Sequence, residues 1–271
     1  MELDMIYNED CLIGMDRIPD MSIDMILCDL PYGTTRNKWD SVIPLDRLWE
    51  QYKRVIKKGG AIVLTCQIPF MINVANSNRE WLRYEWVWVK HNSTGFLNAN
   101  RMPMKVHENI LVFYDSLGKY NPQGAVHSKK KTPCGTMSDI YDTNSDYAKK
   151  KIQMRSANDS SKMTSNYNDS PRGYYFDLTN YPTDVLKFKN DIIAHPTAKP
   201  VALFEYLIRT YTDEGEIVLD NCMGSGTTAV ACIRSGRHFI GFETDEGYCK
   251  MANERISQTK RVYENNLERF L

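Results

Sequence analysis

Short apolar runs alternate along most of the chain with segments in which apolar residues recur every three or four positions. Runs rich in branched and aromatic residues predict strands, and the recurring spacing predicts amphipathic helices. This alternation is typical of a Rossmann-like α/β fold, in which helices cover both faces of a mostly parallel sheet. The seven predicted strands are 5–7, 23–28, 61–66, 84–89, 109–114, 216–219 and 239–242.

Helical spacing predicts four helices around these strands. We expect Gly59–Gly60 to end the first with a left-handed residue, and Asp245 to cap the last. The strands 84–89 and 109–114 have no strong helical pattern between them, so we expect them to pair antiparallel. The predicted helices are 45–56, 201–211, 227–234 and 246–263.

Residues 116–190 interrupt the pattern. Only nine of these 75 residues are Leu, Ile, Val or Phe, and the segment has 12 basic against 7 acidic residues. So long a polar stretch inside a domain is usually functional, disordered or both. We therefore expect residues 1–115 and 191–271 to form two halves of one domain, with 116–190 as an insertion.

Composition excludes several classes of protein. Lysine plus arginine equals aspartate plus glutamate at 34 each, so no overall charge indicates a nucleic-acid partner. The seven cysteines show neither a C-x-x-C pair nor a Cys/His metal spacing. No apolar run approaches the ~18 residues of a membrane helix, and the first residues do not resemble a signal peptide. The sequence predicts a soluble cytoplasmic protein without a metal.

A glycine loop follows the strand 216–219. Glycines at 224 and 226 would let the backbone approach a ligand closely, and no P-loop lysine follows them. Glu243 ends the next predicted strand, 17 residues after Gly226, where a carboxylate can accept both ribose hydroxyls. The third glycine of a dinucleotide fingerprint is missing, which favours a mononucleoside such as S-adenosylmethionine over NAD. The alternative is a tight turn with a solvent-facing glutamate.

The sequence Asp29-Leu30-Pro31-Tyr32 closes the apolar run 23–28. An aromatic amine is a poor nucleophile until two acceptors draw its N–H groups toward tetrahedral geometry. The Asp29 side chain and the Leu30 carbonyl can be those acceptors, because Pro31 holds Leu30 extended. Tyr32 offers a ring on which a flipped base can stack. The alternative is an ordinary exit from a strand into a turn.

Together with two further segments, these motifs resemble the beta class of DNA amino-methyltransferases, in which the catalytic motif precedes the cofactor motif. The resemblance covers nearly the whole chain outside 116–190. It implies the class I S-adenosylmethionine-dependent methyltransferase fold with a permuted motif order. The segments that carry it are 7–11, 22–29, 57–64, 195–200 and the loop 220–228 with Glu243.

The resemblance also implies roles for single residues. Asp29, Leu30, Pro31 and Tyr32 match the catalytic motif. Glu243 would hold the ribose of S-adenosylmethionine, Asp10 would lie against its adenine, and the turn 195–200 would lie on its methionine side. The residues assigned to the cofactor are Asp10, Cys11, Asp29, Thr197, Lys199, Pro200, Asp220, Asn221, Met223, Gly224, Ser225, Gly226, Thr227, Glu243 and Thr244.

One departure concerns Leu30, since the family usually has proline at this position. Leucine keeps the carbonyl, so we expect activity to survive. Asp29 at the first position favours N6 of adenine as the target. Methylation of cytosine N4, or a catalytically silent relative that binds DNA or cofactor, stay as alternatives. RNA ranks low, because amine methylation of RNA generally comes with a different motif order.

Double-stranded DNA is the expected partner, and 116–190 is the expected sequence-reading insertion. Arg101 and Lys105 could reach phosphates, although solvated loop charges are an equally good interpretation. The lysine triplet Lys129, Lys130 and Lys131 suits phosphate contact as well. We expect neither a membrane partner nor a nuclease site in this chain. Monomer and homodimer both stay open.

Overall fold

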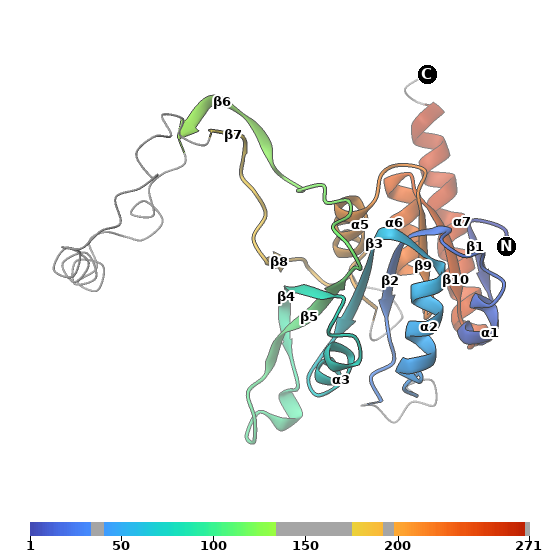
Figure 1. Ribbon diagram of the computed structural model, residues 1–271. Coiled ribbons are helices and arrows are strands. Elements are labelled where there is room, and N and C mark those ends of the chain that lie inside the picture. Colours follow the sequence, from blue (N-terminus) through green and yellow to red (C-terminus); the bar gives the residue numbers. More distant parts are fainter. Residues whose placement is uncertain (34–40, 134–174, 192–197, 269–271) are drawn as a thin grey trace. The chain divides into compact units, whose positions relative to one another are not determined.

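The computed structural model describes residues 1–33, 41–133, 175–191 and 198–268 (Figure 1). The chain divides into two compact units. The first consists of residues 1–123 and 183–271, and the second of residues 124–182. All strands of the main sheet belong to the first unit.

An eight-stranded sheet forms the centre of the first unit. Its strands are β1 (Met5–Tyr7), β2 (Ile23–Asp29), β3 (Ile56–Cys66), β4 (Leu82–Thr94), β5 (Lys105–Phe113), β8 (Val185–Lys187), β9 (Ile217–Asp220) and β10 (His238–Phe242). They are arranged in the order β1-β10-β9-β2-β3-β5-β4-β8. The five strands from β1 to β3 run parallel, and β5 is antiparallel to both its neighbours. The expected mostly parallel α/β sheet is confirmed.

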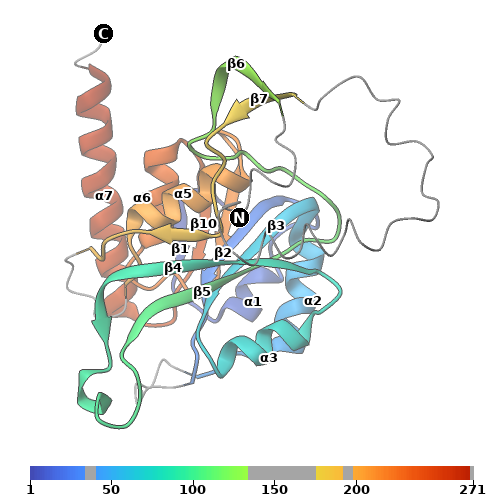
Figure 2. The same cartoon turned by 90° about the vertical axis from the view of Figure 1, so that its left-hand side faces the viewer.

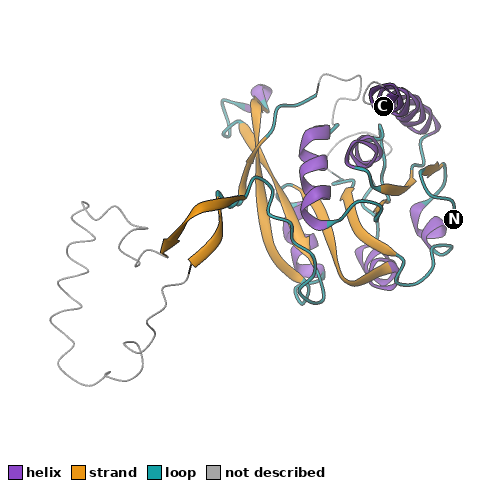
Figure 3. Ribbon diagram, turned by 90° about the horizontal axis from the view of Figure 1, so that it is seen from above, coloured by secondary structure: helices purple, strands orange, loops and turns teal. Residues whose placement is uncertain are grey.

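Helices cover both faces of this sheet (Figure 3). Along β2, Ile26 and Cys28 pack with one group of helices, and Met25 and Leu27 pack with the other. This alternation follows from the two-residue period of a strand that is buried on both faces. No helix in the described ranges is long and apolar enough to cross a membrane. The first group is α1 (Cys11–Met15), α2 (Leu45–Val55) and α3 (Phe70–Ser77), and the second is α5 (Val201–Tyr211), α6 (Thr227–Ser235) and α7 (Glu246–Glu268).

The predicted number of strands in the main sheet was wrong by one. The eighth strand, β8, pairs parallel with β4 and lies within the polar segment 116–190. It has three residues, of which only Leu186 is buried, so it shows no strand pattern of its own. The antiparallel pairing of β4 with β5 is confirmed, and a short 3₁₀ helix (η1, Phe96–Asn98) lies between them.

The predicted role of Gly59–Gly60 was also wrong. Helix α2 ends at Val55, and the chain passes directly into β3 through the extended residue Ile56. Gly59 has φ +75° inside β3, where the register against β2 shifts. A Cβ on Gly60 would lie 2.8 Å from the carbonyl oxygen of Asp24. The glycines therefore permit an irregularity in a strand rather than a helix end.

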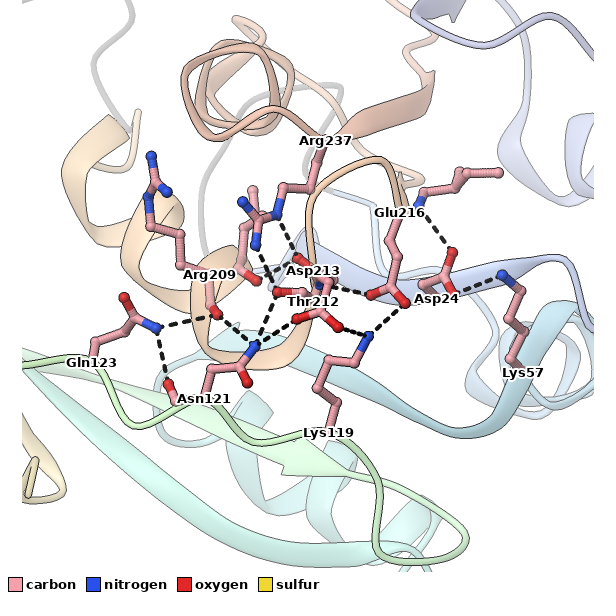
Figure 4. A network of polar contacts seen from close by, with 12 residues as sticks. Asp24, Lys57, Lys119, Asn121, Gln123, Arg209, Thr212, Asp213, Glu216 and Arg237 are labelled. Carbon is pink, nitrogen blue, oxygen red and sulfur yellow. Dashed lines mark hydrogen bonds and ion pairs between the residues drawn. The ribbon is translucent and has the colours of Figure 1, made fainter. Parts of the chain in front are cut away.

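A polar network fastens the segment after β5 to the turn between α5 and β9 (Figure 4). The side-chain amide of Asn121 donates to the carbonyl oxygens of Arg209 and Thr212 at 3.3 and 3.2 Å, and to Asp213 at 3.1 Å. Lys119 forms 2.6 Å ion pairs with both Asp213 and Glu216. This network fixes the chain immediately before it enters the second unit.

Arg237 supports the same turn from within the protein. Its buried guanidinium donates to the Thr212 hydroxyl at 3.1 Å and to the Thr212 carbonyl oxygen at 2.7 Å (Figure 4). Asp24 on β2 accepts from the backbone N–H of Ile217 at 3.0 Å and pairs with Lys57 at 2.6 Å. Buried backbone groups of the turn thus find partners in side chains.

The second unit contains a two-stranded antiparallel ribbon. Strand β6 (Val126–Pro133) pairs with β7 (Tyr175–Thr179). The side-chain amide of Asn180 donates to the carbonyl oxygen of Gly124 at 2.7 Å. Most of the predicted insertion therefore belongs to this unit, while residues 116–123 and 183–190 belong to the first.

Replacing Asn121 with alanine should destabilise the first unit. The change removes one of two side-chain donors to the Arg209 and Thr212 carbonyl oxygens, which still accept from Gln123 and Arg237. A loss of about 0.5–1.5 kcal/mol in the free energy of unfolding is therefore expected. Urea unfolding followed by circular dichroism measures it. The matched control is Asn92→Ala at an exposed position of β4, expected within about 0.5 kcal/mol of the parent. Equal effects of the two substitutions would contradict the anchoring role.

Candidate active site

A cavity of about 640 Å³ lies at the carboxyl ends of the parallel strands. Its wall includes the predicted catalytic residues Asp29 to Tyr32 after β2, and also Gly224 and Glu243, which follow β9 and β10. Ligands of open α/β sheets bind at this edge. The structure thus brings the two main predicted motifs, far apart in the sequence, into one cavity.

Asp29 is the centre of a hydrogen-bond network in this wall. Its Oδ1 accepts from the hydroxyl of Tyr32 at 2.8 Å and from the hydroxyl of Thr65. Its Oδ2 forms a 2.6 Å ion pair with Lys199 Nζ. The side chain keeps 28% of its surface exposed, so a ligand in the cavity can reach it. A carboxylate has about four lone-pair sites, so Oδ2 can accept one more hydrogen bond.

Tyr32 stacks on Phe70, with ring centroids 5.3 Å apart and planes inclined by 28°. Phe70 covers one face of the Tyr32 ring, which leaves the other face for contact with a ligand in the cavity. Burial raises the pKa of Tyr32 and keeps its hydroxyl protonated as a donor to Asp29. The sequence analysis missed both Phe70 and Thr65. Thr65 is directly opposite Asp29 in the β2–β3 register, which a strand alignment could have indicated.

Leu30 lines the cavity, but its side chain is only 3% exposed and belongs to the core between the sheet and helices α1 to α3. Pro31 is half-buried beside it. The leucine side chain therefore contributes to packing below the site. The carbonyl that the sequence analysis assigned to the amine is a backbone group, which any residue at this position supplies.

A row of alternating charges extends from Asp29 along the wall of the cavity. Lys199 Nζ lies 3.3 Å from Glu108 Oε2, and Glu108 Oε1 pairs with Lys90. The side chains of Lys90, Glu108 and Lys199 are only 6–8% exposed. Burial alone would lower the pKa of Lys199, but the carboxylates of Asp29 and Glu108 outweigh it and raise this pKa. Lys199 therefore stays cationic beside Asp29.

The pKa of Glu108 is shifted in the opposite direction to that of Lys199. Burial would raise its pKa, but Lys199 and Lys90 lower it, so the carboxylate stays ionised. The sequence analysis assigned no role to Glu108 or Lys90 and gave Lys199 to the cofactor. The two former residues come from β5 and the end of β4, whose antiparallel pairing brings them together. No sequence motif links them.

Glu243 and the glycine loop form the second half of the cavity. The Glu243 carboxylate accepts from the backbone N–H of Gly224 and of Asp245, each at 2.8 Å. Burial raises the pKa of Glu243. One lone pair on each oxygen remains for a ligand, which fits the two hydroxyls of a ribose. Gly224 has φ +53°, which suits glycine in this turn.

Asp220 supports the loop from below. It is 2% exposed, and it accepts from the hydroxyl of Thr228 and from the backbone N–H of Cys222. Burial raises its pKa to about 6. Since its oxygens already bind the loop itself, Asp220 shapes the cofactor half of the cavity without lining it.

The other predicted cofactor residues fall into three groups. Asp10, Cys11, Asn221 and Thr244 line the cavity with Gly224, Glu243 and Lys199. Thr197 lies outside the described residues. The remaining residues are buried outside the cavity lining, and these are Pro200, Met223, Ser225, Gly226 and Thr227.

Arg101 and Lys105, predicted to contact DNA, lie exposed on the β4–β5 hairpin, which extends beyond the rest of the sheet (Figures 1 and 2). Lys105 Nζ donates at 3.2 Å to Gln67, which lines the cavity. At the tip of the hairpin, Leu97 is 98% exposed. The hairpin therefore presents both charged and apolar side chains to a partner.

The lysine triplet that was also predicted to contact DNA belongs to the second unit. Lys129, Lys130 and Lys131 lie on β6, and their side chains fall outside the described part of the structure. The residues that line the cavity belong to the first unit instead. Phosphate contact by Lys129, Lys130 and Lys131 therefore stays a prediction.

Comparisons with known proteins agree with the geometry of the cavity. The model of the DNA methylase family of N6 and N4 methyltransferases matches residues 23–254. A DNA adenine methyltransferase of Escherichia coli (strain K12), YhdJ, is 30% identical over 264 residues, which cover 93% of this chain and 82% of that protein. The chain therefore belongs to the DNA methylase family.

Two solved structures share the fold. The complex of M1.HpyAVI with SAM has a TM-score of 0.57 at 23% identity, covering 93% of this chain and 98% of that one. The PvuII DNA methyltransferase, which is cytosine-N4-specific, has a TM-score of 0.63 at 14% identity, covering 97% and 92%. The class I methyltransferase fold expected from the motifs is confirmed.

Replacing Asp29 with alanine should abolish methyl transfer and leave the fold and cofactor binding largely intact. The change removes the only side-chain acceptor assigned to the target amine, and misplacement at a reacting centre alone costs about 10²-fold or more. Single-turnover methylation of DNA measures the rate, and calorimetry measures cofactor binding. Asp46→Ala, at an exposed position of α2, is the control. Normal turnover by Asp29→Ala would contradict the catalytic role of Asp29.

Proposed function

We propose that the protein transfers a methyl group from S-adenosylmethionine to the N6 amine of an adenine flipped out of double-stranded DNA. The observation that carries the proposal is the single cavity that joins Asp29 to Glu243 and Gly224. Family membership and the relative named as an adenine methyltransferase support it further. The bound SAM in the M1.HpyAVI structure supports the cofactor.

The residues of the wall suit each part of this reaction. Asp29 Oδ2 and the Leu30 carbonyl would accept the two N–H groups of the amine and make its lone pair available. Glu243 would accept the ribose hydroxyls of S-adenosylmethionine, which supplies an electrophilic methyl group. The amine nitrogen bonds to the methyl carbon as the carbon–sulfur bond breaks, and the amine then releases one proton. Proximity and orientation supply most of the rate.

Cytosine N4 is the second candidate target. Cytosine presents the same exocyclic amine, and the PvuII enzyme, whose name specifies cytosine N4, has the same fold. Aspartate at position 29 and the resemblance to an adenine methyltransferase favour adenine. Identification of the methylated nucleoside decides between the two bases.

DNA contact is part of the proposal. The β4–β5 hairpin combines Arg101 and Lys105 with exposed apolar side chains next to the cavity, and its two basic side chains could contact phosphates. We assign sequence reading to the second unit, residues 124–182. Its phosphate contacts would be Lys129, Lys130 and Lys131.

Three further points belong to the same proposal. A restriction nuclease would be a separate chain. The location would be cytoplasmic. The choice between monomer and homodimer stays open, and sedimentation of the protein with and without DNA decides it.

The deciding experiment is methyl transfer from labelled S-adenosylmethionine to methylation-free genomic DNA, followed by mass spectrometry of the nucleosides. N6-methyladenine supports the proposal, and sequencing of the methylated DNA then gives the target site. N4-methylcytosine would show that cytosine N4, the second candidate, is the target. Cofactor binding without any product would indicate a silent relative and contradict the catalytic proposal.

The affinity for S-adenosylmethionine should decrease as the pH falls. The raised pKa of Glu243 means that acid protonates it readily, and a protonated carboxyl offers fewer acceptors to the ribose. Binding favours the ionised form, so affinity is full above this pKa and lost below it. Calorimetry from about pH 8 to about pH 5 measures the trend. Glu243→Gln should bind more weakly and with a flatter profile, and an unchanged profile would contradict the role of Glu243.

A further inference from the structure

Asp29 Oδ2 and Lys199 Nζ form an acceptor and a donor side by side, 2.6 Å apart, in the wall of the cavity. The ammonium has three N–H donors. One is directed to Asp29 and a second to Glu108 Oε2 at 3.3 Å, although the latter contact has poor hydrogen-bond geometry. A third donor is therefore available to a ligand that binds at Asp29.

The Watson–Crick edge of adenine presents the matching pair. Its N6 amine is a donor, and the adjacent ring nitrogen N1 is an acceptor. A base whose amine binds Asp29 Oδ2 would hold N1 next to the Lys199 ammonium. Lys199 Nζ also lies 5.7 Å from the centroid of the Tyr32 ring, on which the base is expected to stack. Enzymes that flip bases commonly bind this edge.

We propose that Lys199 binds the target adenine by donating a hydrogen bond to N1 while Asp29 accepts from N6, and that Glu108 and Lys90 position Lys199 for this contact. The inference rests on the proposed function. It assigns Lys199 to the base, whereas the sequence resemblance assigned this residue to the cofactor.

The row of buried charges explains why Lys199 can perform this role. A lysine this deeply buried would lose its proton unless carboxylates compensated it. Asp29 and Glu108, which both line the cavity, compensate the charge of Lys199, and Glu108 is itself held by Lys90. Glu108 therefore keeps Lys199 charged and in place even while Asp29 binds the amine. It also adds a negative charge close to a reaction whose methyl donor is cationic.

The first test uses the parent enzyme, with the target adenine of a duplex replaced by 1-deazaadenine or 7-deazaadenine. The 1-deaza base lacks N1, so its single-turnover methylation rate should fall by about 10- to 100-fold, as for the loss of a hydrogen bond to a charged group. The 7-deaza base keeps N1 and should react within about threefold of adenine. Equal rates on adenine and 1-deazaadenine would overturn the inference, and so would a loss confined to 7-deazaadenine.

The second test combines these bases with Lys199→Met. If Lys199 contacts N1, this variant is slow on adenine but no longer distinguishes adenine from 1-deazaadenine. Its affinity for S-adenosylmethionine should stay within about threefold of the parent value. Undiminished discrimination, or a loss of cofactor affinity in place of discrimination, overturns the assignment. Because 1-deazaadenine also changes the reactivity of the amine, this comparison isolates the contact itself.

The positioning role of Glu108 is tested with Glu108→Gln, which keeps the shape and removes the charge. The expected result is a methylation rate about tenfold lower, with weaker discrimination against 1-deazaadenine and unchanged cofactor binding. Glu108→Asp should recover part of the rate. Glu85→Gln on the neighbouring strand β4 is the matched control. Parent behaviour of Glu108→Gln would overturn the positioning role, whereas an inactive parent enzyme would instead overturn the proposed function.

Discussion

The whole site depends on the parallel alignment of β2, β9 and β10, because parallel strands end at the same edge of a sheet. Asp29 ends β2, and Glu243 directly follows β10, so residues far apart in the sequence share one cavity. Asp24 strengthens this alignment, since it binds the N–H of Ile217 at the start of β9. The permuted order of the motifs does not matter to such a site, because the sheet order alone determines which strand ends are neighbours.

The antiparallel strands β4 and β5 add buried charged side chains to the site. They bring Lys90 and Glu108 into the wall of the cavity and place a cation–carboxylate pair next to Lys199. Such a buried pair is seldom a net gain in stability, since removing two charges from water is costly. Its position beside Asp29 is better explained by the electrostatics of the site. Lys199 can stay cationic there, and Asp29 can stay an acceptor.

The sequence alone predicted the motifs that follow a strict local rule. Strand, glycine turn and helix start are consecutive around Gly224, and Asp29 ends an apolar strand, so both were found. Thr65, Phe70, Lys90 and Glu108 were not, because each joins the site through tertiary pairing. Strand β8 and the glycines of β3 were misjudged for a related reason. Three residues carry no periodicity, and a glycine pair resembles a helix end as much as a bulge.

Asp220 and Leu30 show that a residue within a predicted motif can shape the cavity without binding a ligand through its side chain. Asp220 has the composition of a ligand-binding residue, yet its oxygens are used by Thr228 and Cys222, so it acts by shaping the loop. Leu30 departs from the family pattern in its side chain, which is buried in the core. The proposed chemistry requires a carbonyl oxygen at this position, and Pro31 restricts the residue that carries it. Leucine at position 30 therefore changes the packing of the core and keeps the backbone carbonyl as a hydrogen-bond acceptor.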